Sequence, residues 1–176
     1  MKYDIIYADP PWSYQDTGYR TSKDQYPVLD FKELMDLPIY KIASRNCVLL
    51  LWVTMPKLNI VMPIIKAWGF EYKTVAFTWV KKNKKLFWGM GRWTRSNAEL
   101  CLLATKGKPK RVSASIHSII EAPNVGHSIK PDIYDKIVDL LGDIPRIELF
   151  ARESVDGWDA TGLDYDNIDI RDFLIL

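Results

Sequence analysis

Apolar residues along the chain fall in short runs separated by polar, proline-rich or glycine-rich stretches. Runs at 3–8 (YDIIYA), 47–53 (CVLLLWV), 100–104 (LCLLA) and 146–151 (RIELFA) predict buried strands, and β-branched and aromatic residues at 73–80 predict another. The second run is apolar throughout, which indicates a strand covered on both faces, as in a parallel sheet.

Helical spacing of apolar residues occupies the stretches between these runs. Residues 56–68 carry apolar side chains at three- and four-residue intervals, with Gly69 at the expected C-terminal cap. The segment 131–141 has the same spacing, and we expect Lys130-Pro131 to open this helix and Gly142 to end it. Asp30-Phe31-Lys32-Glu33 has the form of a capping box for a short helix to about Asp36.

Strands that alternate with helices predict an α/β fold with a doubly wound, mostly parallel sheet. With 176 residues, the chain suits one domain spanning 1–176. We expect a basic functional loop at about 82–97 and an acidic surface tail at about 164–176.

Composition narrows the class of protein. An apolar fraction of 48% excludes disorder of the whole chain, and the longest apolar run has seven residues, where a membrane-spanning helix needs about 20. The first four residues, Met1-Lys2-Tyr3-Asp4, lack the apolar stretch of a signal peptide. Cys47 and Cys101 lie in apolar runs and read as reduced core residues, so we expect a cytoplasmic protein.

Charge is unevenly distributed although the net charge is only +2. Between Lys81 and Arg111 there are ten basic residues and one acidic residue, Glu99, whereas residues 153–176 contain seven acidic residues and one basic residue. A basic block of this density favours a polyanionic partner. A solvated loop whose lysines maintain solubility is the alternative reading.

Asp9-Pro10-Pro11-Trp12 directly follows the first predicted strand, at the end where open α/β sheets bind ligands. The Asp9 carboxylate and the Pro10 carbonyl can each accept one hydrogen from a primary amine, and Trp12 can stack on a flat ring. The two prolines stiffen the turn and bring no N–H donors. A plain β-turn with a core tryptophan is the alternative for this string taken alone.

Six further motifs follow it in order along the chain. They are Leu51-Trp52-Val53-Thr54, Ala67-Trp68-Gly69-Phe70, Thr78-Trp79-Val80-Lys81, Gly91-x-Trp93-x-Arg95-x-x-x-Glu99-x-x-Leu102, His127-Ser128-x-Lys130-Pro131 and Glu148-Leu149-Phe150-Ala151-Arg152. With the Asp-Pro-Pro-Trp string, this set resembles the S-adenosylmethionine-dependent methyltransferases that act on the N6 amino group of adenine. The branch is that of the eukaryotic messenger-RNA adenosine methyltransferase catalytic subunit and its bacterial and phage relatives.

The resemblance implies a Rossmann-like methyltransferase fold in permuted order, with the catalytic strand first and the cofactor strand last. It implies transfer of a methyl group from S-adenosylmethionine to adenine in nucleic acid, with DNA placed ahead of RNA. Asp9, Pro10, Pro11 and Trp12 would form the catalytic motif. We expect a cytoplasmic protein encoded by a bacterium or phage.

The resemblance also assigns residues to the cofactor. Asp9, His127, Ser128, Lys130, Arg152 and Asp164 would surround it, with Lys130 near the carboxylate of its methionine moiety. The Gly157-Trp158-Asp159-Ala160-Thr161-Gly162 turn is similar to the family's ribose-binding turn. There the next two positions are usually polar, but here the first is Leu163, which leaves Asp164 to serve the ribose.

Target contacts are expected in and beside the basic loop. They are Lys81, Arg92, Trp93, Arg95, Asn97 and Glu99, which combine cations for phosphates with an aromatic ring for base stacking. For Asn97 and Glu99, an equal alternative is that they only mark the N-terminal end of the strand that begins near Leu100. The chain contains no metal-ligand spacing, Ser/His/Asp set or dinucleotide-binding glycine fingerprint.

Two rival functions remain: an inactive nucleic-acid-binding partner subunit, and a small-molecule N-methyltransferase. The intact Asp9 argues against the first, and the basic block against the second. Base-edge and phosphate contacts are both needed to select one adenine, and the basic block is the evident surface for them. We therefore expect a homodimer, or a heterodimer with a related subunit; a monomer of low specificity that methylates many adenines is the alternative.

Overall fold

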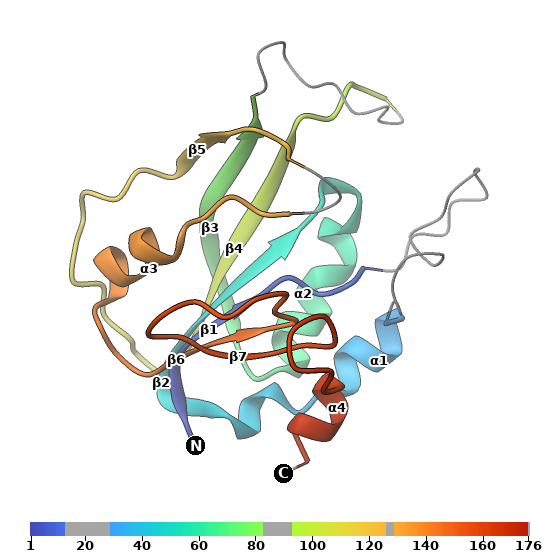
Figure 1. Ribbon diagram of the computed structural model, residues 1–176, viewed down its shortest axis with the longest axis vertical. Helices are drawn as coiled ribbons and strands as arrows, with labels where there is room; N and C mark the ends of the chain where they lie inside the picture. The colour runs from blue at the N-terminus through green and yellow to red at the C-terminus, as the bar shows by residue number, and fades with distance from the viewer. Residues whose placement is uncertain (13–28, 83–92, 126–128, 176) are drawn as a thin grey trace.

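The computed structural model describes residues 1–12, 29–82, 93–125 and 129–175. These residues form one seven-stranded sheet with the strand order β5-β3-β4-β2-β1-β6-β7 (Figure 1). The strands are β1 (Tyr3–Ala8), β2 (Ala43–Val53), β3 (Glu71–Lys81), β4 (Ala98–Lys106), β5 (Ile119–Ala122), β6 (Arg146–Leu149) and β7 (Asp159–Thr161). The helices are α1 (Phe31–Asp36), α2 (Leu58–Ala67), α3 (Tyr134–Leu141) and α4 (Ile170–Phe173), with 3₁₀ turns at Ile39–Lys41 and Met55–Lys57.

The sheet is mostly parallel, as the apolar runs indicated. β1 pairs in parallel with β2 and with β6, β6 with β7, and β3 with β5. β4 alone runs antiparallel to both of its neighbours, β2 and β3. The first strand therefore lies beside β6, the last of the strands expected from the sequence, which confirms the Rossmann-like fold and places the expected catalytic and cofactor strands side by side.

Two apolar clusters cover the two faces of the sheet because successive side chains of each strand point to opposite sides. Ile6 and Ala8 of β1 belong to the cluster shared with α1, α2 and α4. Ile5 and Tyr7 belong to the cluster shared with α3. Helices thus pack on both faces, which confirms the doubly wound arrangement (Figure 1).

Local signals of the sequence account for several boundaries. Asp30 and Glu33 form the expected capping box of α1. Gly69 and Gly142 follow α2 and α3 with φ values of +85° and +96°, a backbone conformation that favours glycine. Cys47 and Cys101 are free and buried, in agreement with their reading as core residues.

Two of the boundaries that differ from the sequence-based expectation have a local cause. The helix expected from Pro131 begins at Tyr134, because the Asp132 side chain accepts the Tyr134 N–H at 3.2 Å and Ile133, with φ −131° and ψ 10°, is not helical. The strand expected at 146–151 ends at Leu149, because Phe150 adopts φ +62° and turns the chain.

The two edge strands, β5 and β7, were not expected. Each has three or four residues and exposes part of its length, so neither carries the apolar run that marked the central strands. The acidic tail also holds a short helix, α4, whose Ile170 and neighbouring Leu174 are buried in the core. Within the described ranges, no helix is long and apolar enough to cross a membrane.

Candidate active site

The Asp9–Trp12 turn leaves the C-terminal end of β1, near the middle of the sheet. The Trp12 N–H donates to the Pro10 carbonyl at 2.8 Å, which closes a tight turn and leaves the carbonyl its second lone pair. The Trp12 indole N–H donates to the Trp52 carbonyl at 3.1 Å, and only 7% of the Trp12 surface is exposed. Trp12 therefore anchors the turn in the core.

Four charged side chains form a ladder of alternating sign at this end of the sheet. The Lys130 ammonium lies 3.1 Å from the Asp9 carboxylate and 2.9 Å from the Glu99 carboxylate. The other oxygen of Glu99 lies 2.5 Å from the Lys81 ammonium. The ladder joins residues that the sequence assigned separately to catalysis, cofactor and target.

Strand directions explain why these residues meet. Asp9 follows β1 and Lys81 ends β3. These two strands are parallel, so their C-terminal ends lie at the same end of the sheet, hereafter called the catalytic edge. β4 runs the opposite way, so Glu99 near its start lies at that edge as well. Lys130 reaches the edge from the segment before α3.

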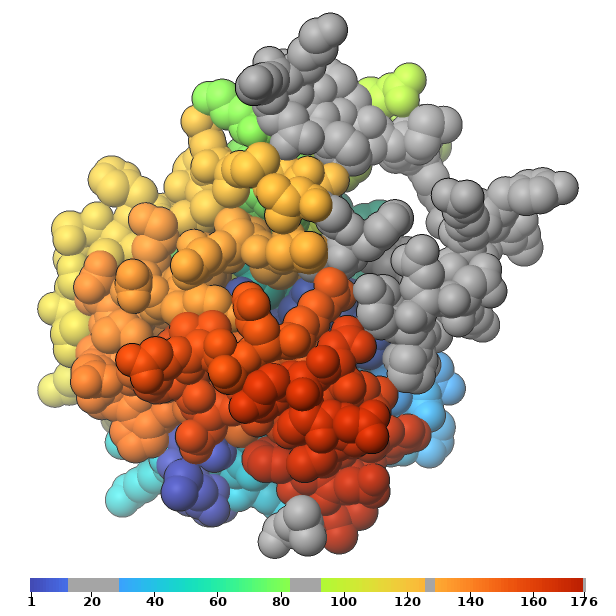
Figure 2. All heavy atoms as spheres, in the orientation of Figure 1, coloured from blue at the N-terminus to red at the C-terminus, as the bar shows by residue number. Residues whose placement is uncertain are grey.

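Figure 2 shows the heavy atoms as spheres, seen from the same side as in Figure 1. Blue and teal atoms from the first third of the chain are visible at the bottom of a hollow between orange segments. Lys130, Asp9 and Glu99 expose only 12%, 19% and 9% of their side chains. The ladder is therefore largely shielded from water, where charge–charge attraction is stronger than at the surface.

Burial and pairing act against each other on the pKa values of the ladder. Burial raises the pKa of Asp9 and outweighs the lowering by Lys130 and Arg152, so its pKa lies above the usual value. Burial also raises the pKa of Glu99, but Lys130 and Lys81 together bring it below the usual value. For Lys130, burial lowers the pKa, but the two carboxylates raise it by more, so its pKa lies above the usual value and the lysine stays charged.

Tryptophan rings support the two ammonium groups. The Lys130 ammonium lies 5.8 Å from the centre of the Trp52 ring, and the Lys81 ammonium 4.8 Å from that of Trp79. Trp52 is fully buried and donates its indole N–H to the Tyr7 hydroxyl at 2.7 Å. The ladder thus rests on rigid aromatic side chains of the sheet.

Glu148 is a buried carboxyl group near the site that sequence reasoning missed as a functional candidate. It lies beside Tyr7 in the β1–β6 register and accepts a hydrogen bond from the Tyr134 hydroxyl at 2.8 Å. Burial raises its pKa to about 7, against a lowering by the Tyr134 hydrogen bond and with smaller increases from Asp9 and Glu153. The available signal was an acidic residue inside a run otherwise typical of a core strand.

The turn after β6 lies close to the turn after β7. The Ala151 N–H donates to the Thr161 carbonyl at 3.0 Å, and a Cβ on Gly162 would lie 2.4 Å from the Ala151 carbonyl oxygen. Only glycine permits this approach. Beside it, the Arg152 guanidinium lies 3.8 Å from the Asp164 carboxylate.

The chain matches the MT-A70 family model over residues 3–164. The chain belongs to the MT-A70 family. It is 34% identical over 185 residues to the type II methyltransferase M.MunI of Mycoplasma sp, a match that covers 93% of this chain and 78% of that protein.

Two human relatives share lower identity with this MT-A70 chain. One is the N(6)-adenosine-methyltransferase catalytic subunit METTL3, at 29% identity over 97% of this chain and 30% of that protein. The other is the N(6)-adenine-specific methyltransferase METTL4, at 28% identity over 91% of this chain and 37% of that protein. The family resemblance inferred from the seven motifs is confirmed.

Of the remaining expected site residues of this MT-A70 chain, some lie outside the described residues and others lie near the start of β4. His127, Ser128 and Arg92 lie outside the described residues. Trp93 is fully exposed and Arg95 is exposed, both just before β4. Asn97 accepts the Lys81 N–H on its backbone carbonyl at 2.8 Å, so it holds β3 and β4 together at the catalytic edge.

The basic block expected as one surface is divided by the fold. β4 carries the chain from Glu99 at the catalytic edge to Lys106 at the opposite edge. The expectation of a single basic surface over 81–111 is therefore wrong, since Lys81 and Lys108 lie at opposite ends of a nine-residue strand. Among its lysines at the catalytic edge, Lys81 pairs with Glu99 and Lys82 with Glu121.

Lys130 does not open the following helix as the sequence predicted. Helix α3 begins four residues later, at Tyr134, so no helix N-terminus lies directly at Lys130. Asp9 and Glu99 hold its ammonium in the described structure. Among the residues described, no group of three or more His, Cys, Asp or Glu side chains could hold a metal ion.

Proposed function

We propose that this MT-A70 chain transfers a methyl group from S-adenosylmethionine to the N6 amino group of adenine in DNA. The observation that carries the proposal is the Asp9 carboxylate at the end of β1, held by Lys130 at 3.1 Å, next to the carbonyl of Pro10. Family membership and the names of the adenine-N6 methyltransferase relatives support the same reaction.

The residues present fit the proposed cofactor by their chemistry. An ammonium and a guanidinium, from Lys130 and Arg152, suit its carboxylate, and Asp9 and Asp164 offer carboxylates for its ammonium and ribose hydroxyls. When bound, the cofactor supplies a methyl group already activated by a sulfonium. The close turns at Ala151 and Gly162 provide backbone groups beside Arg152 and Asp164. We call the region formed by Asp9, Lys130, Arg152 and Asp164 the cofactor corner.

Alignment of the amine is the main task of the protein in this reaction. The Asp9 carboxylate and the free lone pair of the Pro10 carbonyl each accept one N6 hydrogen, which directs the nitrogen lone pair toward the methyl group. Positive charge grows on this nitrogen during transfer, and the Asp9 carboxylate stabilises it. The nitrogen then loses its proton, so a strong general base is not needed.

DNA is the proposed substrate because the type II methyltransferase M.MunI matches this chain over 78% of its own length. The name "type II methyltransferase" is used for DNA-modifying enzymes. An adenine in a duplex must be turned out of the stack to reach Asp9. The exposed Trp93 and Arg95 lie beside the site and offer a stacking surface and a phosphate contact.

The test incubates the full chain with methyl-labelled S-adenosylmethionine and matched DNA and RNA oligonucleotides, followed by mass spectrometry of the nucleosides. The proposal expects labelled N6-methyldeoxyadenosine from DNA and none from an Asp9→Ala variant. Label on adenosine alone would contradict DNA as substrate, and label on a different base would contradict the reaction.

A second copy of the chain is the proposed partner, because β4 carries Lys106 and Lys108 of the basic block away from the catalytic edge. Two copies would place more phosphate contacts around one target. Sedimentation with and without a DNA substrate tests this. A monomer under both conditions, with full activity on a defined site, would rule out the partner.

A further inference from the structure

The end of the sheet opposite the catalytic edge, where β2 begins and β4 ends, carries a second group of cations, hereafter the distal basic surface. It consists of Lys41, Arg45, Lys106, Lys108 and Lys110, from two separate parts of the chain. Four of these are exposed, and Lys106 is half-buried. Neither the proposed reaction nor the cofactor corner uses any of them.

Hydrogen bonds hold this surface in one arrangement. The Lys106 ammonium donates to the carbonyls of Tyr40 at 3.2 Å and Ala43 at 3.3 Å, which ties β4 to the start of β2. The Lys108 N–H donates to the Asn46 side-chain oxygen at 2.9 Å. Lys108 and Lys110 therefore project from an anchored turn.

Gly107 makes this turn possible. It adopts φ +68°, and a Cβ there would lie 2.3 Å from the Arg45 carbonyl oxygen. The close approach brings the Lys108–Lys110 turn against Arg45. A cavity of about 320 Å³ opens beside it, lined by Asn46, Lys108 and Lys110 together with Asp4 and four other residues.

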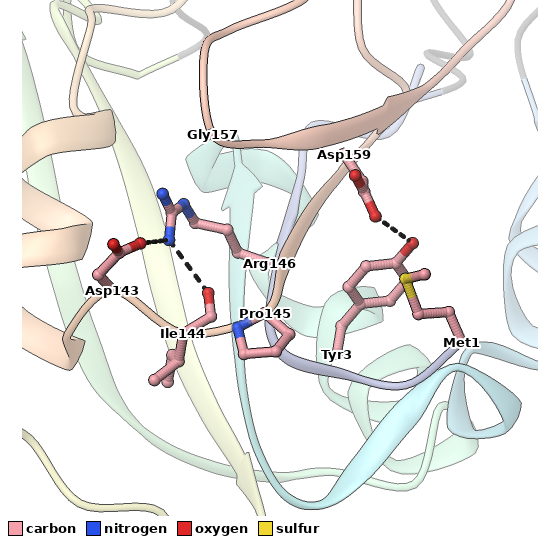
Figure 3. Close-up of a pocket in the computed structure, with 8 residues that line it drawn as sticks. All are labelled: Met1, Tyr3, Asp143, Ile144, Pro145, Arg146, Gly157 and Asp159. Atoms are coloured by element: carbon pink, nitrogen blue, oxygen red, sulfur yellow. Dashed lines mark hydrogen bonds and ion pairs between the residues drawn. The ribbon is translucent and has the colours of Figure 1, made fainter.

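Asp4 shares this cavity with Lys108 and Lys110, but among the described residues it forms no ion pair with either, and two further carboxylates nearby pair with other cations. Asp143 lies 2.5 Å from Arg146, at the rim of the adjoining cavity of about 370 Å³ in Figure 3. Glu71, which pairs with Thr105 across β3 and β4, lies 2.7 Å from Lys73. Within the described ranges, none of the five basic side chains forms an ion pair, in contrast to Lys81, Lys82 and Lys130.

We propose that the distal basic surface binds the phosphate backbone of the DNA that flanks the target adenine. The inference rests on the proposed function for the identity of the polyanion. Unpaired, exposed lysine and arginine side chains gain affinity from phosphates by displacing condensed counterions. The contacts carry no base information, so they add affinity and leave the choice of adenine to the catalytic edge.

The dimensions of the sheet set the length of DNA required. Glu99 and Lys106 are seven residues apart on β4, which corresponds to about 24 Å at about 3.4 Å per residue. DNA that runs along the sheet covers that distance with about 7 base pairs. A short duplex centred on the target adenine cannot reach the distal basic surface.

The acidic tail of a second copy fits this surface less well than DNA. Its carboxylates are partly engaged within their own chain: Asp169 lies 2.6 Å from Arg171, and Asp164 pairs with Arg152. Arg171 also contacts Glu33. A phosphate backbone presents a regular row of charges without such partners.

The experiment measures the salt dependence of DNA binding by the full chain carrying Lys108→Ala and Lys110→Ala. The matched control carries Lys66→Ala and Lys136→Ala, two exposed lysines on α2 and α3 that remove the same charge elsewhere. Fluorescence anisotropy is recorded with a duplex of about 30 base pairs and with a hairpin of about 8 base pairs, lengths chosen to include and exclude the distal surface.

The proposal expects a weaker salt dependence for the Lys108/Lys110 variant on the long duplex, by about 2 in the slope of log K against log salt. The same variant keeps the wild-type slope on the short hairpin and methylates it at the wild-type kcat. The control keeps the wild-type slope on both.

Equal slopes for variant and control, or equal loss on both DNA lengths, overturns the proposal. A change in sedimentation without a change in DNA binding also overturns it, in favour of a second copy as the occupant. A wild-type chain that binds long DNA through this surface but methylates no adenine contradicts the proposed function alone, so the two failures are distinguishable.

Discussion

Lysines at the two edges of the sheet have the same side chain but opposite environments. At the catalytic edge, Lys130 is 12% exposed and bonded to two carboxylates, whose charges raise its pKa in spite of burial. At the distal edge, Lys108 and Lys110 are exposed and make no ion pair among the described residues. A buried lysine of this kind orients neighbouring groups, whereas an exposed one acts through a field that salt screens.

The antiparallel strand β4 produces this difference. The basic segment is continuous in sequence, but β4 runs through it and places its two ends at opposite ends of the sheet. A count of charges along the chain therefore mixes groups that serve the reaction with groups that face solvent.

The largest effect is expected for Asp9→Ala at the catalytic edge. The variant loses the carboxylate that orients the amine, so kcat should fall about 10²- to 10³-fold or more. Thermal unfolding should be little changed, because Lys130 keeps Glu99 as a partner when the Asp9 carboxylate is removed. The exposed Asp156→Ala variant is the control and should keep wild-type kcat; retention of more than a tenth of kcat by Asp9→Ala would contradict the assignment.

Lys130→Ala comes next, with an expected 10- to 100-fold loss, about 1.4 to 2.8 kcal/mol, in affinity for S-adenosylmethionine. The physical reason is the removal of a buried ammonium from the corner proposed for the cofactor carboxylate. Calorimetry of cofactor binding measures it, with Lys136→Ala as an exposed control. An unchanged Kd would remove Lys130 from the cofactor site.

Lys81→Met tests the buried ladder against its exposed neighbour. Without Lys81, the two carboxylates share one lysine, the pKa of Asp9 rises, and the acidic limb of the kcat/KM profile moves to higher pH. We expect about a 10-fold lower kcat/KM at neutral pH, since breaking a buried pair leaves an uncompensated charge.

Lys82→Met is the matched control, because Lys82 is 55% exposed and its pair with Glu121 is at the surface. It should leave the pH profile unchanged, and Lys81→Arg should restore most of the activity. Equal pH profiles for Lys81→Met and the wild type would show that Lys81 only contacts the target, as the sequence suggested.

The smallest effect concerns stability and Glu148. Its pKa is about 7 in the folded protein and 4.5 is its ordinary value, so the neutral carboxyl stabilises the fold at low pH and this contribution is lost as pH rises toward and through 7. We expect the free energy of unfolding to fall by about 1–2 kcal/mol between pH 5 and 8, a value reduced for solvent screening.

Glu148→Gln should abolish this part of the pH dependence, as measured by denaturant unfolding at several pH values. The exposed Asp156→Asn variant should keep the wild-type slope. A Glu148→Gln variant with the same slope as the wild type would show that Glu148 is ionised throughout.

The sequence alone predicted the central elements and the family. Apolar runs identified β1, β2 and β4, which are buried on both faces, and also β6, and helical spacing identified α2 and α3. The Asp-Pro-Pro-Trp string and six further motifs predicted an adenine-N6 methyltransferase, and the family match confirms the resemblance. These features depend on residues close together in the chain, where local patterning is informative.

Tertiary structure alone decided how the site is assembled. The direction of β4 places Glu99 between Lys81 and Lys130, and this contact joins residues up to 49 positions apart in sequence. The same strand removes Lys106 and Lys108 to the opposite edge. Edge strands β5 and β7, the positive φ of Phe150 and the pairing of Glu148 with Tyr134 also escaped prediction. Each depends on partners distant in the chain, because strand pairing and buried charge pairing are set by position in space rather than by local pattern.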